Sequence, residues 1–288
     1  MVRDILVAIE QNIPSFSKGQ RQIGRYILEN YDKAAFMTAS KLGKTVSVSE
    51  STVVRFASEL GYDGYPGMQK ALQDMIRNKL TSIQRFEVSE DRIGTGDVLD
   101  KVMHSDIEKI RMTMEEIDRL DFTASVDAIL KANRIYIAGA RSAMTIAGFL
   151  AFYFNMIFDN VVHVQTTSMT DMFESMFRMK EGDVVIAASF PRYSKRTVRA
   201  ARFARDRGAT VIAITDSESS PLVPLAHHRL IAKSDMASFV DSLVAPLSLC
   251  NALIVALGRK KPKEVSENFE FLEQVWSDYE IYGVADEN

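Results

Sequence analysis

The chain of 288 residues is poor in the residues that build disulfide frameworks and metal sites, with one cysteine and four histidines. The single cysteine, Cys250, cannot form an intrachain disulfide, and its apolar surroundings are typical of a small buried residue. The histidines are scattered and give no metal-ligand spacing. We therefore expect a protein of a reducing cytoplasm that needs neither a metal nor another cofactor.

The sequence also lacks an apolar run of the roughly 18 or more residues that a transmembrane helix needs. Its two most apolar stretches, residues 143–158 and 242–258, are shorter than that, and the second contains Pro246 and Asn251. The N-terminus has no long apolar segment of the signal-peptide type and is typical of a short amphipathic helix. Both apolar stretches are better interpreted as core helices, and no membrane partner is expected.

Length and charge indicate two domains of different character. At roughly 100 to 200 residues per domain, the chain has room for about two. The net charge is -3, which is unpromising for a nucleic-acid-binding protein, but residues 1–86 contain 12 Lys and Arg against 8 Asp and Glu. This balance of +4 contrasts with -7 for the rest of the chain, 23 against 30. The modest basic excess predicts that DNA affinity would depend on a homodimer or tetramer with several DNA-binding heads.

Within the basic part, residues 38–62 have the layout of a DNA-reading helix-turn-helix. Apolar residues of the second helix recur at i, i+3, i+4 and i+7 and form one buried stripe, namely Val53, Phe56, Ala57 and Leu60. At about 100° per residue, the opposite face carries polar side chains; these are Ser51, Arg55, Ser58 and Tyr62, with Thr52 on the flank. Ser47 and Glu50 fit a capping box, Ser49 is a second possible N-cap, and Gly61 marks the expected end.

Such a helix presents its first residues to base edges in the major groove while neighbouring groups hold phosphates. We expect Ser49, Ser51, Thr52 and Arg55 to contact bases or nearby phosphates of an operator in double-stranded DNA. Lys41 and Lys44, on the preceding short helix, are the expected phosphate contacts. The alternative from periodicity alone is an amphipathic helix pair packed in any α-helical protein.

The run VSESTVVRFASELGYDGYPGMQKAL resembles the N-terminal domain of the RpiR family of bacterial sugar-responsive transcription regulators. The family pattern VSxxTVxRFxxxLGxxGYxxxK is met by Ser49, Thr52, Val53, Arg55, Phe56, Leu60, Gly61, Gly64 and Tyr65. This resemblance implies a helix-turn-helix followed by a sugar isomerase (SIS) domain.

The flanking sequence predicts an all-helical DNA-binding domain over residues 1–84. Residues 17–31 favour a helix capped by Ser17, and Pro66 suits the first turn of another that continues to about residue 82. The polar segment 85–97 is the expected linker. Residues 98–120 and 123–132 favour two helices that lead into a second domain, residues 98–288.

From Arg134 onward, short apolar segments alternate with helical ones, a pattern typical of an α/β fold with a parallel sheet flanked by helices. Ligands of such sheets bind beyond the carboxyl ends of the strands. Two loops there, GARSA and SFPRYSKRT, each follow a strand and open a helix. Their backbone N–H groups, hydroxyls and cations predict an anion site, with the candidate residues Gly139, Arg141, Ser142, Ser189, Arg192, Tyr193 and Ser194. The alternative is that these serines only cap helices.

Residues 129–258 resemble an SIS domain, whose strand-end pattern SxSGxT holds the phosphate of a phosphosugar. Ser189 matches the first serine and Ser194 the threonine, but Pro191 replaces the second serine and Arg192 the glycine. The first loop likewise has Arg141 where a glycine is usual. The resemblance implies an anionic sugar derivative as the effector, with phosphate and carboxylate both open.

We expect a transcription regulator that is not an enzyme. The alternative is a sugar-phosphate isomerase with an accessory DNA-binding head, because aldose-ketose isomerisation needs a general base. The candidate bases are His163, Glu174, His227 and His228. The last two lie beside an expected strand, where a strand-edge role is the simpler interpretation.

Overall fold

The computed structural model describes residues 5–76, 83–84, 96–164, 168–234 and 240–281. The described residues form two compact units, with the main boundary between Lys101 and Val102; Val240 and Asp241 also group with the first unit. No helix in this part of the chain combines the length and the apolar character that crossing a bilayer requires.

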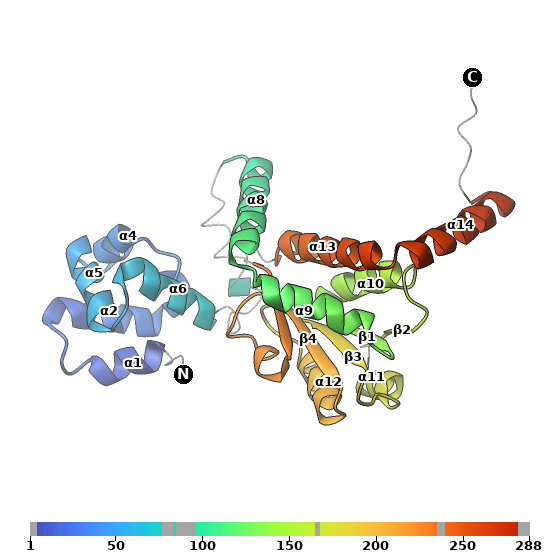
Figure 1. Cartoon of the computed structure of the whole chain (residues 1–288). Coiled ribbons are helices and arrows are strands. Elements are labelled where there is room, and N and C mark those ends of the chain that lie inside the picture. The colour runs from blue at the N-terminus through green and yellow to red at the C-terminus, as the bar shows by residue number, and fades with distance from the viewer. Residues whose placement is uncertain (1–4, 77–82, 85–95, 165–167, 235–239, 282–288) are drawn as a thin grey trace, which may run out of the picture. The chain divides into compact units, whose positions relative to one another are not determined.

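The first unit is entirely helical around one apolar core (Figure 1). Its helices are α1 (Ile5–Asn12), α2 (Lys18–Glu29), α3 (Tyr31–Ala34), α4 (Ala39–Thr45), α5 (Glu50–Glu59) and α6 (Gly64–Ile76). Val53, Phe56 and Ala57 of the predicted stripe are fully buried, and Leu60 packs partly buried against the same core. The Phe56 ring lies 5.0 Å from that of Phe16, which joins α5 to the start of α2.

The predicted cap of α2 is confirmed. The Ser17 hydroxyl accepts from the backbone N–H of Gln20, and the Gln20 side chain accepts from the N–H of Ser17 at 2.9 Å, so both partners of a capping box are present. The helix ends at Glu29, before the expected Tyr31, because Asn30 leaves helical geometry. The expected continuation of α6 over residues 77–82 and most of the expected linker lie outside the described residues.

The second unit contains a five-stranded, fully parallel sheet in the order β2-β1-β3-β4-β5. The strands are β1 (Ile135–Gly139), β2 (Val161–His163), β3 (Val184–Ala188), β4 (Thr210–Thr215) and β5 (His228–Ile231). The helices are α8 (Val98–Glu116), α9 (Arg119–Leu130), α10 (Ala143–Phe154), α11 (Met169–Met176), α12 (Lys195–Asp206), α13 (Val244–Lys260) and α14 (Pro262–Asp278), with a short 3-10 turn, η1 (Val223–Leu225).

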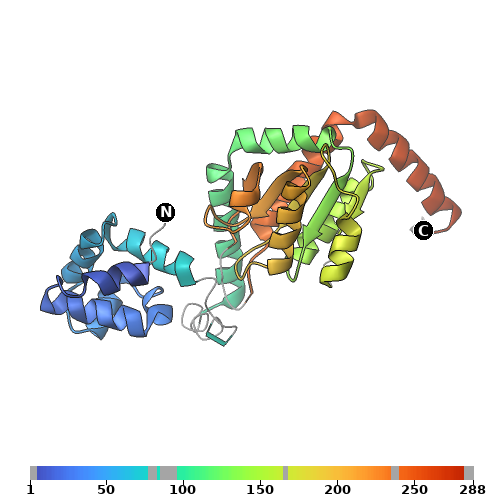
Figure 2. The same cartoon turned by 90° about the horizontal axis from the view of Figure 1, so that it is seen from below.

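Helices cover both faces of this sheet, as the alternation of strands and helices predicts (Figures 1 and 2). Along β1, Ile135 and Ile137 join the core under α9, α10 and α13, whereas Tyr136 and Ala138 join the core under α11 and α12. Every residue of β1 and β3 is buried, which explains why these strands are continuous apolar runs.

The two apolar stretches are core helices, as expected. They correspond to α10 and α13, and Cys250 on α13 is fully buried, with its pKa raised by burial to about 12.

The predicted helix 98–120 was too long, because Asp118 caps the start of a new helix there. Its carboxylate accepts from the N–H groups of Leu120 at 2.8 Å and Asp121 at 3.1 Å.

Candidate functional sites

The turn between α4 and α5 is tight, as a helix-turn-helix requires. The N–H of Val48 donates to the carbonyl of Gly43 at 2.9 Å, and Ser47 in the turn has a φ of 57°. A Cβ at Gly43 would lie 2.8 Å from the Val48 carbonyl oxygen, so only glycine allows this approach.

Ser49 is the N-cap of α5, so the first of the two alternatives, Ser47 in a capping box, is wrong. The Ser49 hydroxyl accepts from the N–H of Thr52 at 3.3 Å, whereas Ser47 is used in the left-handed turn before the helix. At the other end, Gly61 has a φ of 87°, and the N–H of Tyr62 donates to the carbonyl of Ala57 at 3.1 Å. This bond, together with the left-handed backbone of Gly61, is typical of a Schellman motif, which ends the helix.

The outer face of α5 exposes Ser51, Arg55 and Ser58, as the helical wheel predicts. Tyr62 departs from that prediction: the helix ends before it, its side chain packs against the core, and burial raises its pKa. Sequence reasoning missed Val54, which lies between these polar residues on the outer face with 39% of its surface exposed.

A hollow of about 540 Å³ lies beside the first turn of α5 and brings together Ser49, Thr52 and Arg55. Its other wall is the start of α2, including Ser17 and Gly19, so two helix N-termini line one concavity. Only the capping signal at Ser17 in the sequence pointed to this second wall. Three of the four predicted base-contacting residues thus share the hollow, and the fourth, Ser51, lies 2.9 Å from Ser49, measured between the two hydroxyl oxygens.

Lys41 and Lys44 are exposed on α4 and do not line this hollow. The backbone N–H of Lys41 donates to the Thr38 hydroxyl at 3.1 Å, which caps α4. Lys41 lies in the first turn of α4 and Lys44 in its last turn, so this helix presents two cations to solvent, as phosphate contacts require.

In the second unit, the strand order reverses direction at β1, since the chain moves from β1 to β2 on one side and then to β3 on the other. Ligand sites of open parallel sheets lie at such a switch point, beyond the carboxyl ends of the strands. The loops that leave β1 and β3 there are residues 140–142 and 189–194, which are the two loops that the sequence singles out.

A cavity of about 590 Å³ lies between these two loops. Four cations and no acidic residue or histidine line it; the full lining is Ala140, Arg141, Met144, Arg192, Tyr193, Ser194, Lys195 and Arg196. The structure thus brings together four of the seven predicted residues, whereas Gly139, Ser142 and Ser189 do not line the cavity. Sequence reasoning did not select Lys195 and Arg196, although both stand in the quoted SFPRYSKRT segment.

The three remaining residues have other positions in the loops. Ser142 is exposed at the start of α10 and makes no capping bond. Gly139 is buried at the end of β1, where a Cβ would lie 2.3 Å from the Ala143 carbonyl oxygen. The Ser189 hydroxyl, also buried, accepts from the N–H of Ser194 at 3.1 Å and so closes the second loop.

Both arginines that replace family glycines keep the glycine-type backbone. Arg141 has a φ of 60° and Arg192 a φ of 61°, in the left-handed region that costs an L-residue roughly 1–2 kcal/mol. Beside Arg192, the Tyr193 hydroxyl donates to the carboxylate of buried Asp216 at 2.8 Å and is thereby fixed at the cavity wall. Strain of this kind at two facing loops is typical of a functional site.

None of the candidate bases lines the cavity. His227 and His228 lie at the start of β5, the opposite end of the strand from the ligand edge. His227 Nδ1 accepts from the N–H of Val211 at 2.9 Å, and burial, with the charges of Arg205 and His228, lowers the pKa of its imidazole. Among the described residues, no group of three or more His, Cys, Asp or Glu could hold a metal ion.

Two family models match separate parts of the chain. The helix-turn-helix domain of the rpiR family matches residues 3–79, and the SIS domain matches residues 128–256. The chain belongs to the RpiR family. Over 281 residues it is 25% identical to an uncharacterized HTH-type transcriptional regulator of Caldanaerobacter subterraneus, an alignment that covers 95% of this chain and 97% of that protein.

One solved structure of a relative matches nearly the whole chain, and another matches its second part. The NanR protein of Vibrio vulnificus, solved in complex with ManNAc-6P, is 26% identical, with a TM-score of 0.60 over 95% of this chain and 98% of that one. The sugar isomerase domain of an RpiR transcription factor from Sphaerobacter thermophilus matches 62% of this chain and 99% of its own with a TM-score of 0.58. At 24% identity, the second likeness concerns the fold.

Proposed function

We propose that this protein is a DNA-binding transcription regulator whose SIS domain senses a phosphosugar or a related anionic sugar derivative and thereby changes operator affinity. The observation that carries the effector half is the cavity at the switch point, lined by four cations without an acidic residue. The complex of NanR with ManNAc-6P supports a phosphorylated sugar as the ligand class. The cations would hold the anion, and Tyr193 and Ser194 would hydrogen-bond sugar hydroxyls.

The DNA half rests on the outer face of α5. Ser49, Ser51, Thr52 and Arg55 would contact bases or nearby phosphates in the major groove, with Lys41 and Lys44 on phosphates. A single head with a charge balance of +4 neutralises few phosphates, so we infer that a homodimer or tetramer binds two or more half-sites.

Effector and operator are coupled only if the ligand prefers one arrangement of the heads over another. By linkage, DNA must then change ligand affinity by the same factor as ligand changes DNA affinity. We further propose that the protein acts by this coupling and not by turnover, since the cavity lining offers no carboxylate or imidazole as a general base.

A two-stage experiment tests the proposal. Random-sequence selection on the purified protein should enrich one DNA motif, and a thermal-shift screen of phosphosugars and sugar acids should give a hit. The hit should then alter affinity for the selected DNA in the wild-type protein and not in Arg141→Ala/Arg192→Ala. The matched control is Arg199→Ala, which removes a cation of the same helix, α12, that does not line the cavity.

Selection without an enriched motif would refute the DNA half. A ligand response that survives in the double variant would move the effector site elsewhere. If NMR of the sugar shows that the protein converts the hit, the isomerase alternative would replace the regulator hypothesis.

A further inference from the structure

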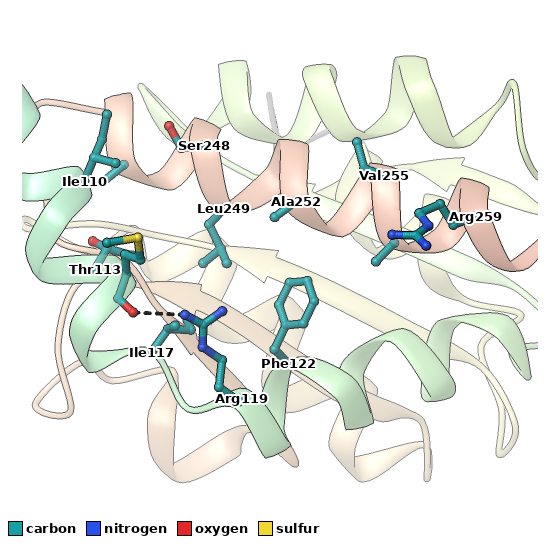
Figure 3. A pocket seen from close by; sticks show the side chains of 13 residues that line it. Ile110, Thr113, Ile117, Arg119, Phe122, Ser248, Leu249, Ala252, Val255 and Arg259 are labelled. Atoms are coloured by element: carbon teal, nitrogen blue, oxygen red, sulfur yellow. Dashed lines mark hydrogen bonds between the residues drawn. The ribbon is translucent and has the colours of Figure 1, made fainter.

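A groove in the second unit lies apart from the cation-lined cavity, between α8, α9 and α13 (Figure 3). It holds about 480 Å³ and its walls are mainly apolar, with Met114 on α8, Phe122 on α9 and Val255 on α13. Met114 and Val255 are each 60% exposed, so water contacts a concave apolar surface there. Exposed apolar concavities of this kind are typical of docking sites.

The α13 wall of the groove is a regular stripe. Ser248, Ala252, Val255 and Arg259 recur at i, i+4, i+7 and i+11 and lie along one side of the helix (Figure 3). The two small residues, Ser248 and Ala252, leave room for large side chains of an opposing helix, as in ridges-into-grooves packing. The shape of the groove therefore fits a helix laid along α13.

The same chain contains an amphipathic helix, α14, whose apolar stripe is at most partly buried. The apolar residues of α14 recur with alternating spacings of four and three, and the pattern continues to the C-cap residue; they are Val265, Phe269, Leu272, Trp276 and Tyr279. Val265 packs on the core of the unit, but no residue of α14 is buried, and Tyr279 is 75% exposed. In both views α14 extends away from α13 and from the sheet (Figures 1 and 2).

Contacts at the start of α14 hold it in this direction. The Asn268 side chain donates to the Met156 carbonyl at 3.0 Å, and the Lys261 ammonium lies 5.4 Å from the centre of the Phe158 ring, just before the helix. These contacts tie the first half of α14 to the residues that follow α10, whereas the groove lies between α8, α9 and α13.

The charges of helix and groove are complementary. The two charged residues that line the groove are both cations, Arg119 and Arg259. Between Pro262 and Asp278 there are five acidic residues and one lysine, a balance of -4. Among those acids, Glu273 directly follows Leu272 of the stripe, at the flanking position from which coiled-coil residues pair with the partner helix.

We propose that α14 of one chain docks in the α8–α9–α13 groove of a second copy, and that the second copy returns the same contact. The two helices match in length: α13 and α14 have 17 residues each, which is about 26 Å at a rise of 1.5 Å per residue. The reciprocal exchange closes as a twofold dimer, because each copy carries one helix and one groove.

Mixed cross-linking of the full chain tests which copy supplies the helix. Ala252→Cys places a thiol in the groove and Leu272→Cys places one on the α14 stripe, in separate chains. The buried Cys250 is a poor nucleophile, and the unaltered chain controls for it. With a short thiol-reactive cross-linker, the equimolar mixture should give a dimer band that neither variant gives alone.

Substitutions provide an independent measurement by sedimentation. Leu272→Glu or Ala252→Glu should raise the dimer dissociation constant by about 30-fold or more, the effect of losing an interface hot spot. Phe271→Glu is the matched control, since Phe271 is a neighbouring aromatic on α14, 66% exposed, that lies off the stripe; it should leave the constant unchanged. Glu273→Arg and Arg259→Glu should each weaken the dimer, and the two together should restore it.

Several results would overturn the proposal. A monomeric protein would do so, as would a dimer whose dissociation constant does not change in Leu272→Glu and Ala252→Glu. A dimer band from Ile107→Cys on α8, together with no dimer band from the mixture of Ala252→Cys and Leu272→Cys, would assign the dimer to another face. None of these outcomes depends on DNA or effector. A monomeric protein would also remove the homodimer of the proposed function, whereas a dimer on another face would leave the proposed function intact.

Discussion

The two candidate sites of this chain both lie at a helix N-terminus, but the side chains there differ in charge. In the first unit, the N-cap and first turn of α5 carry three hydroxyls, Ser49, Ser51 and Thr52, beside one acidic residue, Glu50. In the second, α12 begins with Lys195 and Arg196, and the cavity there is also lined by Arg192 of the preceding loop and Arg141 of the loop after β1. The first arrangement suits the shared reading of bases and phosphates on a large ligand, and the second suits the capture of a small, highly charged one. Under the proposed function, the cations are therefore concentrated at the site of the smaller ligand.

The largest expected effect is a loss of stability in one unit and not in the other. Gly139→Ala should destabilise the second unit by more than about 4 kcal/mol, because the new Cβ would lie 2.3 Å from a backbone oxygen. Differential scanning calorimetry should show the unfolding transition of that unit lowered or lost. The transition of the helical unit should be unchanged.

Gly258→Ala, on α13, is the control for that experiment. No atom lies within 4 Å of its Cβ position, so the helix propensity of alanine should make this variant neutral or more stable by up to about 1 kcal/mol. Equal losses in both variants would mean that the close approach at Gly139 is not the cause.

A second prediction tests whether recognition on α5 resides in its one exposed cation. Arg55→Ala should weaken binding to the selected DNA by about 1–3 kcal/mol if the guanidinium contacts a guanine edge. Ligand affinity in the absence of DNA should not change. Fluorescence anisotropy against the selected DNA measures the first quantity, and Arg25→Ala on α2 serves as the control. An unchanged DNA affinity would leave the hydroxyls of α5 as the recognition elements.

A third prediction sharpens the contrast at the cavity, where charge and backbone strain coincide. Arg192→Gly should lose effector affinity and yet raise stability by about 1 kcal/mol, because glycine adopts the φ of 61° without penalty. Arg192→Ala should lose the same affinity and keep the strain. Thermal unfolding and ligand titration of both variants test this prediction. Equal stability of the two variants would show that the backbone at position 192 carries no strain that glycine relieves.

Much of this could be predicted from sequence wherever a single local rule decides. The buried stripe of α5, the cap at Ser17 and the parallel sheet follow from periodicity and capping, and both candidate loops follow strands. The details that were missed depend on competition between neighbours. Ser49 displaced Ser47 as the cap because the turn needed Ser47 in a left-handed conformation. Gly139 proved to be a packing position, and Lys195 and Arg196 joined the cavity, because side-chain directions depend on how two loops meet.

The smallest effect concerns His227, a candidate base that lies outside the cavity. Its pKa is lowered by burial, so the unfolded chain binds the proton first as the pH falls, and protonation removes the acceptor for the N–H of Val211. Stability should therefore be unaffected above about pH 6.5 and decrease as the pH falls below it. Chemical denaturation of wild-type protein and His227→Gln between pH 5 and 8 should show a weaker dependence in the variant. Effector binding should be the same in both proteins, because the imidazole lies at the opposite end of the strand from the ligand edge.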